Sequence, residues 1–435
     1  MKPSRVKDLL ELLPDLEELW EVRAALIRAS YPDPDRTWAA SGELQTAEDR
    51  LVDPDGFQRV LTELRKEEHE HRTRVQEQTQ TALRQRSLGK SDEAVDALLS
   101  AAALEEARGR FRQSGAYASA AHSQALLSRN QRLISLVLRR RARAGRSLGF
   151  LDEALDHYAE AHRIAAAVGD HQGVAEAAIG AGNVLEQGGR WREAAGWYQG
   201  ALAVLSGEDE AMPERWHASL NLHIVHRSLG RVAESAEWLE RAESMAHSMD
   251  DASAEFFLVH ARGQLRMAES RFEAAEQDFL EALSKAPPAH RPMARLNLAE
   301  SLLARGQGLG AAEEARAAEA EAIIAGRTVI LPHVYRTLGR CASTMGNRDS
   351  FVLFERALEL PGPESANRLE RGTTLQEYAV TVMELGLRDE AADLMSRAAQ
   401  QFRLIGVNHF RRRWADCFDV GSTEMDGHEA LSCFS

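Results

Sequence analysis

The hexapeptide GFLDEA at residues 149–154 recurs, with small changes, as GRWREA at residues 189–194 and GLRDEA at residues 386–391. Turn starts of this kind follow one another with a nearly constant period of about 40 residues, as expected of a tandem repeat. After Gly149 they are Gly189, Gly230, Ser270, Gly306, Gly346 and Gly386, and an earlier copy begins at Gly89, about one and a half periods before Gly149. Glycine before a new amphipathic stretch is typical of a helix that ends in the left-handed conformation. The repeat therefore predicts pairs of antiparallel helices, each joined by a tight turn.

Small residues recur at three fixed distances from these turns. Most units carry Ala, Gly or Ser seven residues before the turn start, five after it and twelve after it; around Gly189 these are Gly182, Ala194 and Ala201. A larger side chain there would push two helices beyond the usual axial distance of about 8–10 Å. Two places depart from the pattern. His223 occupies a small position, and Phe351 with Phe354 suggests a shift of one residue in the seventh unit.

This pattern resembles the tetratricopeptide repeat family over about residues 70–405, although the period is longer here than the family's period of about 34 residues. The resemblance implies an all-α fold: a right-handed α-solenoid of about eight helix-turn-helix hairpins with an N-terminal helical segment. We expect residues 1–69 to form an N-terminal helical cap or a small helical module, with a helix beginning near Pro54. Residues 406–435 are expected to hold the end of the last helix and a loosely ordered tail.

The overall charge narrows the class of partner. The net charge is −14, from 53 basic and 67 acidic residues, which disfavours nucleic acid and anionic membrane as main partners. No stretch approaches the roughly 20 apolar residues that a membrane-spanning helix needs, and the N-terminal residues are too charged for a signal peptide. Three cysteines without paired spacing indicate a reducing compartment. We therefore expect a cytoplasmic protein, whose oligomeric state the sequence leaves open.

None of the motifs that carry catalysis is complete. His69-Glu70-His71 lacks the spacing of four residues that places two zinc ligands on one helix face. The glycine-rich stretch at residues 306–310 lacks the preceding strand and the Lys-Ser/Thr pair of a phosphate-binding loop. We expect no enzyme activity, no metal site and no cofactor.

Candidate binding residues come from the phase of the resemblance, because first-helix positions line the concave side of such solenoids. One group offers amide donors and acceptors that suit a peptide backbone: Asn183, Asn221 and Asn297. A second group offers guanidinium groups that suit carboxylate or phosphate: Arg139, Arg143, Arg146, Arg336 and Arg340. The alternative is that these are ordinary solvated residues and arginines partnered by glutamates of neighbouring helices.

The resemblance extends only in part to the carboxylate clamp of some tetratricopeptide domains. Asn183 and Asn221 resemble two clamp asparagines, but Ile179 and Ala261 stand where the lysine and the arginine are expected. The leading hypothesis is a scaffold or adaptor that binds a peptide or protein segment in the concave groove, as extended chain or as helix, with acidic segments among the candidates. The alternatives are a peptide-responsive regulatory sensor and a regulatory subunit of a separate enzyme such as a protease or kinase.

Overall fold

The computed structural model describes residues 54–405 apart from residues 109, 207–210, 247–251, 288–289, 325–327, 348 and 361–367. Most of residues 1–69 and all of residues 406–435 thus lie outside the described part, so the expected cap and tail remain predictions. The described part is helical, and it contains no strand. A long helix, α4 (Pro54–Ser87), begins at the predicted proline and runs through residues 69 and 70 without a break.

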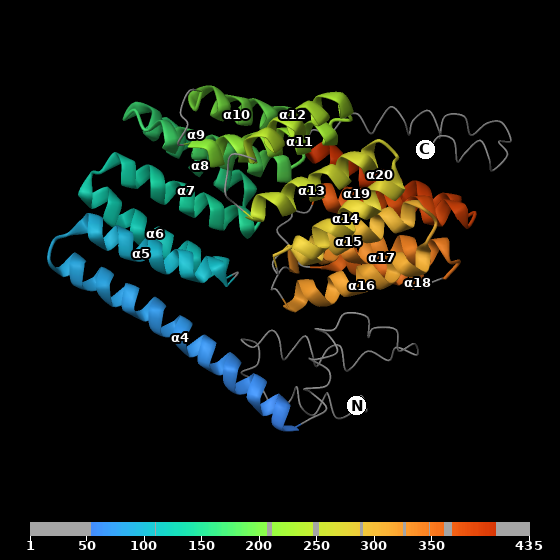
Figure 1. Ribbon diagram of the computed structural model, residues 1–435, viewed down its shortest axis with the longest axis horizontal. Helices are drawn as coiled ribbons and strands as arrows, with labels where there is room; N and C mark the ends of the chain where they lie inside the picture. The colour runs from blue at the N-terminus through green and yellow to red at the C-terminus, as the bar shows by residue number, and fades with distance from the viewer. Residues whose placement is uncertain are drawn as a thin grey trace.

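In the described part of the chain, eight hairpins follow α4 in chain order. Figure 1 shows their helices stacked one after another in a curved array. The first four are α5 (Ser91–Ala107) with α6 (Phe111–Ser128), α7 (Gln131–Ser147) with α8 (Leu151–Ala167), α9 (His171–Gln187) with α10 (Trp191–Val204), and α11 (Met212–Ser228) with α12 (Val232–Ala246). The last four are α13 (Ala252–Ala268) with α14 (Phe272–Lys285), α15 (Arg291–Ala304) with α16 (Gly308–Ile324), α17 (Leu331–Thr344) with α18 (Asp349–Glu359), and α19 (Arg368–Glu384) with α20 (Arg388–Leu404). A short 3-10 turn, η4 (Thr328–Ile330), precedes α17. The predicted right-handed α-solenoid of about eight hairpins is confirmed.

The odd-numbered helices lie on the inner side of the curved array. From α5 to α17, each packs against its hairpin partner and also against the odd-numbered helix of the next hairpin. Among the described residues, even-numbered helices do not contact one another in this way, because the array opens toward its outer side. The odd-numbered helices therefore form the wall of an inner groove.

The hairpin turns have the conformation that the glycines predicted. Gly149 has φ +82°, and the chain around it closes the end of α7 with a hydrogen bond from Phe150 N to Gly145 O of 2.9 Å. Ser270 takes the same left-handed conformation, φ +59°, where other units have glycine. This conformation strains residues that carry a Cβ, which explains why glycine predominates at the turn.

Close contact inside the hairpins explains the small residues. A Cβ at Gly182 would lie 2.4 Å from Cε1 of the buried Tyr198, so only glycine fits under that ring. His223, the departure from the pattern, is also fully buried, and it meets Ser235 where most units have alanine. The Ser235 hydroxyl lies 2.9 Å from His223 Nδ1 and donates to His223 O at 3.0 Å. A polar pair has replaced an apolar one; the hydrogen bonds within it satisfy His223 Nδ1 and the Ser235 hydroxyl, while His223 Nε2 has no partner among the described residues.

The first repeat begins at a different turn from the one that the sequence suggested. Gly89 does separate two antiparallel helices, α4 and α5, but the hairpin in phase with the others is α5–α6, whose turn lies one full period before Gly149. When the positions are counted from this turn, the three that carry small residues in the other units (seven before the turn start, five after it and twelve after it) are occupied by buried Ala102, Ser114 and Ala121. The long interval from Gly89 to Gly149 is thus half a repeat plus a whole one. The error arose because the turn between hairpins resembles the turn within them.

The seventh hairpin shows the predicted shift of one residue. Ser350, Phe354 and Ala357 are buried where residues 351, 355 and 358 would stand in the regular phase. Phe354 packs over Gly339, whose Cβ would lie 3.1 Å from the ring. The buried face of α18 therefore starts one residue earlier than in the other hairpins, and the packing is otherwise of the same kind.

Candidate functional site in the inner groove

The predicted arginines of α7 lie on one face of the helix, but they differ in their partners. Arg139 forms an ion pair with Glu176 of α9, with 3.6 Å between Nη2 and Oε2. Arg143 forms one with Glu106 of α5, with 3.2 Å between Nε and Oε1. These contacts with neighbouring odd-numbered helices place both residues on the inner wall. The alternative interpretation, arginines partnered by glutamates of adjacent helices, holds for these two.

Arg146, the third of the group, makes no hydrogen bond or ion pair within the described part of the chain, and its Nε is buried without a partner. It lies close enough to Glu186 of α9 to influence that carboxyl electrostatically. Burial raises the pKa of Glu186, while the hydrogen bond from Tyr198 and the charges of Arg146 and Arg227 oppose the rise. The Tyr198 hydroxyl lies 3.2 Å from Glu186 Oε2. Arg146 thus faces a carboxyl that burial disfavours in its charged form.

Two of the predicted asparagines bind each other across neighbouring helices. Asn221 of α11 donates from Nδ2 to Oδ1 of Asn183 of α9 at 2.9 Å. The single proton of the Tyr198 hydroxyl is shared between the same oxygen, at 2.7 Å, and Glu186 Oε2, at 3.2 Å. An amide has one acceptor oxygen and two N–H donors. The Asn183 N–H groups and the Asn221 oxygen make no hydrogen bond within the described residues. The pair therefore presents both a donor and an acceptor on the partly exposed inner wall.

Arg227 of α11 was not singled out from the sequence. Its side chain is enclosed by protein deep in the groove but is still partly exposed, and its Nε has no hydrogen-bond partner among the described residues. Burial lowers the pKa of Arg227, whereas the charges of Glu186 and Glu300 act in the opposite direction. Arg227 stands three residues before its turn start, as Arg146 and Glu186 do before theirs. This shared position relative to the turn is the sequence signal from which Arg227 could have been predicted.

The third predicted asparagine lies apart from the other two. Asn297 of α15 has its Nδ2 2.6 Å from Nε2 of His260 on α13. Burial, together with the charges of Arg227, His290 and His223, lowers the pKa of His260 to about 4. A neutral imidazole nitrogen can accept a hydrogen bond from the amide, which matches this contact. Asn297 thus binds a neutral histidine and does not join the Asn183–Asn221 pair.

The arginines of α17 are fully paired. Arg336 contacts Glu370 at 2.8 Å through Nε and Glu377 at 2.9 Å through Nη1, and its side chain is only 8% exposed. Arg340 lies 3.8 Å from both Glu300 and Glu377. Burial alone would lower the pKa of Arg336, but the surrounding carboxylates, Glu377 first, raise it. This network of α15, α17 and α19 is an internal set of ion pairs.

Glu300 belongs to the same network. Its carboxylate lies 2.9 Å from His333 Nε2. Burial would raise the pKa of Glu300, but His333, Arg336 and Arg340 outweigh it and hold that pKa far below its usual range. For Arg336 and Arg340 too, the alternative interpretation holds, and the partnering carboxylates, which the sequence did not identify, are Glu300, Glu370 and Glu377.

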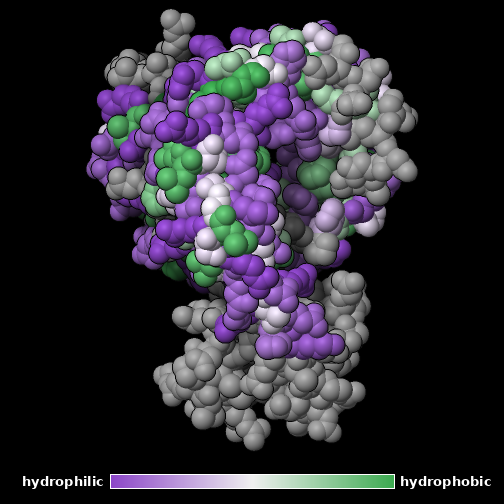
Figure 2. All heavy atoms as spheres, turned by 90° about the vertical axis from the view of Figure 1, so that its left-hand side faces the viewer, coloured by the Kyte–Doolittle hydropathy of each residue, from purple (hydrophilic) through white to green (hydrophobic). Residues whose placement is uncertain are grey.

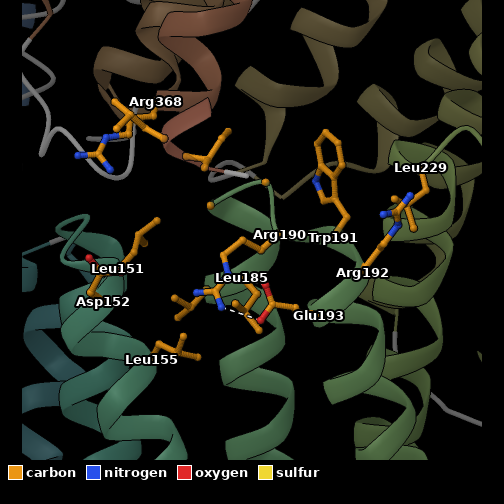
Figure 3. Close-up of a pocket in the computed structure, with 15 residues that line it drawn as sticks. Leu151, Asp152, Leu155, Leu185, Arg190, Trp191, Arg192, Glu193, Leu229 and Arg368 are labelled. Carbon is orange, nitrogen blue, oxygen red and sulfur yellow. Dashed lines mark hydrogen bonds and ion pairs between the residues drawn. The ribbon is translucent and has the colours of Figure 1, made fainter. Parts of the chain in front are cut away.

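A separate pocket of 560 Å³ lies outside the groove wall, where late hairpins approach early ones (Figure 3). The ends of α8–α10, with Leu151, Leu155 and Trp191, face the start of α19 and the end of α20. Arg190 and Glu193, which also line it, bind each other through two contacts of 2.8 and 2.6 Å. None of the predicted binding residues lines this pocket. It marks the place where the superhelix nearly closes on itself.

The surface seen from the α4–α9 side is mostly hydrophilic, with small scattered hydrophobic patches and a hollow beside its centre (Figure 2). No helix among the described residues is long and apolar enough to span a membrane. The described residues also contain no cluster of three metal-ligating side chains. The candidate site is the polar inner wall, where Arg139 and Arg143 pair with residues of neighbouring odd-numbered helices and Asn183 binds Asn221.

The arrangement defines a helical-repeat solenoid with a polar inner groove. The family model described as tetratricopeptide repeat matches residues 133–206, which span α7 to α10. Residues 133–206 thus match the repeat that the sequence pattern predicted, and the repeat of this chain is longer than the usual one of about 34 residues.

Two solved structures share this fold. The Rap conjugation gene regulator of the plasmid pLS20, in complex with the Phr* peptide, is 14% identical with a TM-score of 0.55, and the match covers 77% of this chain and 95% of that one. A Rap protein complexed with competence and sporulation factor is 14% identical with a TM-score of 0.54, covering 78% and 99%. No curated protein matches the chain. At such low identity the likeness extends to the fold alone.

Proposed function

We propose that the chain is a non-enzymatic interaction scaffold that binds a peptide or protein segment in its inner groove. The observation that carries this proposal is the Asn183–Asn221 pair, which keeps an unused donor and an unused acceptor on adjacent helices. An extended peptide backbone offers the complementary groups at every residue. Because Tyr198 fixes the Asn183 amide from behind, the pair is already oriented before any peptide arrives, which lowers the ordering entropy of binding.

A peptide-responsive regulator is the second candidate. Its support is that the two Rap structures of the same fold are both complexes, one with the Phr* peptide and one with competence and sporulation factor. In such a regulator the N-terminal residues 1–69 would act as the output module. A regulator should become more compact when a peptide binds, which small-angle scattering measures as a smaller radius of gyration. A scaffold should keep its radius and should co-purify with a larger protein.

Selection of randomised peptides displayed on phage, with the full chain as bait, tests the proposed function directly. Peptides recovered from it should bind at least 10-fold more weakly to Asn221→Ala, which removes the amide from the inner wall. Asn347→Ala is the matched control, because Asn347 lies at the exposed α17–α18 turn and bonds only locally with Asp349. If no peptide is selected, or if both variants bind equally well, the groove is not the binding site.

A further inference from the structure

The inner wall holds two guanidinium groups around one carboxyl. Arg146 of α7 and Arg227 of α11 act electrostatically on Glu186 of α9, the helix that lies between them. Neither arginine forms an ion pair closer than 4 Å within the described residues, and each has a buried Nε without a hydrogen-bond partner. Buried guanidinium N–H groups normally find acceptors, since an unpaired one loses its hydration without compensation. This part of the groove therefore has more hydrogen-bond donors than acceptors.

The excess of hydrogen-bond donors is confined to this part of the groove. Arg139 and Arg143 each form an ion pair within 4 Å, with Glu176 and Glu106, although Nε and Nη1 of Arg139 are also buried without a hydrogen-bond partner. Arg336 of α17 has two carboxylates within 3 Å, whereas Arg146 and Arg227 have none at that distance among the described residues. The chain as a whole is acidic, with a net charge of −14. An under-neutralised pair of arginines in such a chain is therefore a specific feature and does not follow from general basicity.

We infer that Arg146 and Arg227 form a seat for a carboxylate of the bound peptide, beside the Asn183–Asn221 pair that holds its backbone. This inference rests on the proposed function and names the chemistry of the segment that the groove takes. A carboxylate fits better than a phosphate, because Glu186 and Glu176 lie nearby and would repel a dianion more than a single charge. The planar guanidinium also matches a carboxylate through paired N–H···O bonds.

The seat also has a built-in dependence on pH. Glu186 competes with the ligand for both arginines when it is charged, and burial raises its pKa. The groups that face it are Arg146 from α7, Tyr198 from α10 and Arg227 from α11. As pH falls and Glu186 takes up its proton, the arginines lose their internal counter-charge. Carboxylate binding should therefore become tighter as pH falls through the raised pKa of Glu186, and Glu186→Gln should remove this trend.

Selection of random hexapeptides against the full chain provides the probes. An Asp or Glu, or a free C-terminus, should be enriched at one fixed position. Synthetic versions of a selected peptide, with Asp changed to Asn or with the C-terminus amidated, distinguish a side-chain carboxylate from a terminal one. Binding by calorimetry should weaken about 10- to 100-fold in Arg227→Gln and Arg146→Gln, as expected for a lost charge-assisted hydrogen bond. Arg227→Lys should retain part of the affinity.

Arg163→Gln is the matched control, since Arg163 lies exposed on the outer helix α8 and pairs with Glu160. It should bind like the unchanged chain. Circular dichroism and thermal unfolding verify that each variant is folded. Selected peptides without acidic preference, or full affinity in both groove variants, would overturn the carboxylate seat and leave peptide capture standing. Failure to select any peptide would overturn the proposed function together with the seat.

Discussion

The two halves of the inner wall use arginine in opposite ways. Between α15 and α19, Arg336 is enclosed by Glu370 and Glu377, so its charge is neutralised internally. Between α7 and α11, Arg146 and Arg227 face one carboxyl whose charged form burial disfavours. The pKa of Arg336 is raised and that of Arg227 is lowered, although burial disfavours the charge of both. The difference teaches that arginines of the later half are paired within the array, whereas Arg146 and Arg227 of the earlier half leave guanidinium donors unpaired among the described residues.

The largest expected effect is the loss of the later network. Arg336→Met should lower the free energy of unfolding by about 3 kcal/mol, because Glu370 and Glu377 would remain partly buried without a counter-charge. Hydrogen exchange should locate the loss in α15–α19. Arg397→Met is the control: its ion pair with Asp393 is exposed, and an exposed pair contributes at most about 1 kcal/mol. Equal effects of the two variants would mean that the network does not stabilise this half.

Acid should weaken the middle of the array, between the two halves. Burial lowers the pKa of His223 to about 4, and this side chain is fully buried. A histidine with a lowered folded pKa stabilises fully above its unfolded value of about 6.5, and this stabilisation is lost as pH falls toward 4. The loss approaches about 3 kcal/mol at pH 4, on the scale of 1.36 kcal/mol per pKa unit.

Hydrogen exchange at pH 7 and pH 5, corrected for intrinsic rates, can locate that loss. Protection should fall in α11–α14, where His223 and His260 lie, and should remain in α19–α20, which contain no histidine. Uniform loss along the chain would contradict the assignment to these histidines.

Two glycine-to-alanine substitutions should distinguish the effect of close packing on stability from the effect of helix propensity. Gly182→Ala should cost about 2 kcal/mol, because its Cβ would meet the Tyr198 ring, and it should also disturb the hydroxyl that orients Asn183. Gly200→Ala, in the neighbouring helix α10, has no atom within 4 Å of its Cβ and should stabilise by about 0.5–1 kcal/mol. Thermal unfolding of the two variants should therefore shift in opposite directions. A stabilising Gly182→Ala would show that the ring can move aside.

Most of the fold could be predicted from the periodic spacing of the repeat. Periodic glycines and small residues fix where helices end and touch, so the hairpins and even the shift at Phe354 could be read from residue spacing. The half-repeat error at Gly89 shows the limit, because both kinds of turn obey the same local chemistry. Geometry within one helix cannot tell which turn lies inside a hairpin. That distinction comes from contacts between helices that are far apart in sequence, such as those of α5 with α7.

The candidate site could be predicted less well than the fold. Helical spacing placed Arg139, Arg143 and Arg146 on one face, yet it could not say which of them has a partner. That depends on acids of other helices, such as Glu106 and Glu176. Selection by residue type favours Asn and Arg, and it passes over Glu186 and Glu300 in the same wall. Which acid pairs with which arginine depends on how the helices pack in the assembled array, and residue spacing along one helix does not reveal it.

The smallest expected effect on stability is also the sharpest test of the comparison between the halves. Arg227→Met removes a guanidinium whose pKa burial lowers and which has no close counter-charge among the described residues, so the free energy of unfolding should stay within about 1 kcal/mol or rise. The same change at Arg336 should destabilise. Affinity for acidic peptides should follow the reverse order, with a large loss at Arg227 and little change at Arg336. Denaturant unfolding and calorimetry on both variants measure the two quantities. Destabilisation of more than about 2 kcal/mol at Arg227 would show that this arginine is neutralised internally, because only a cation with a counter-charge stabilises the fold that contains it.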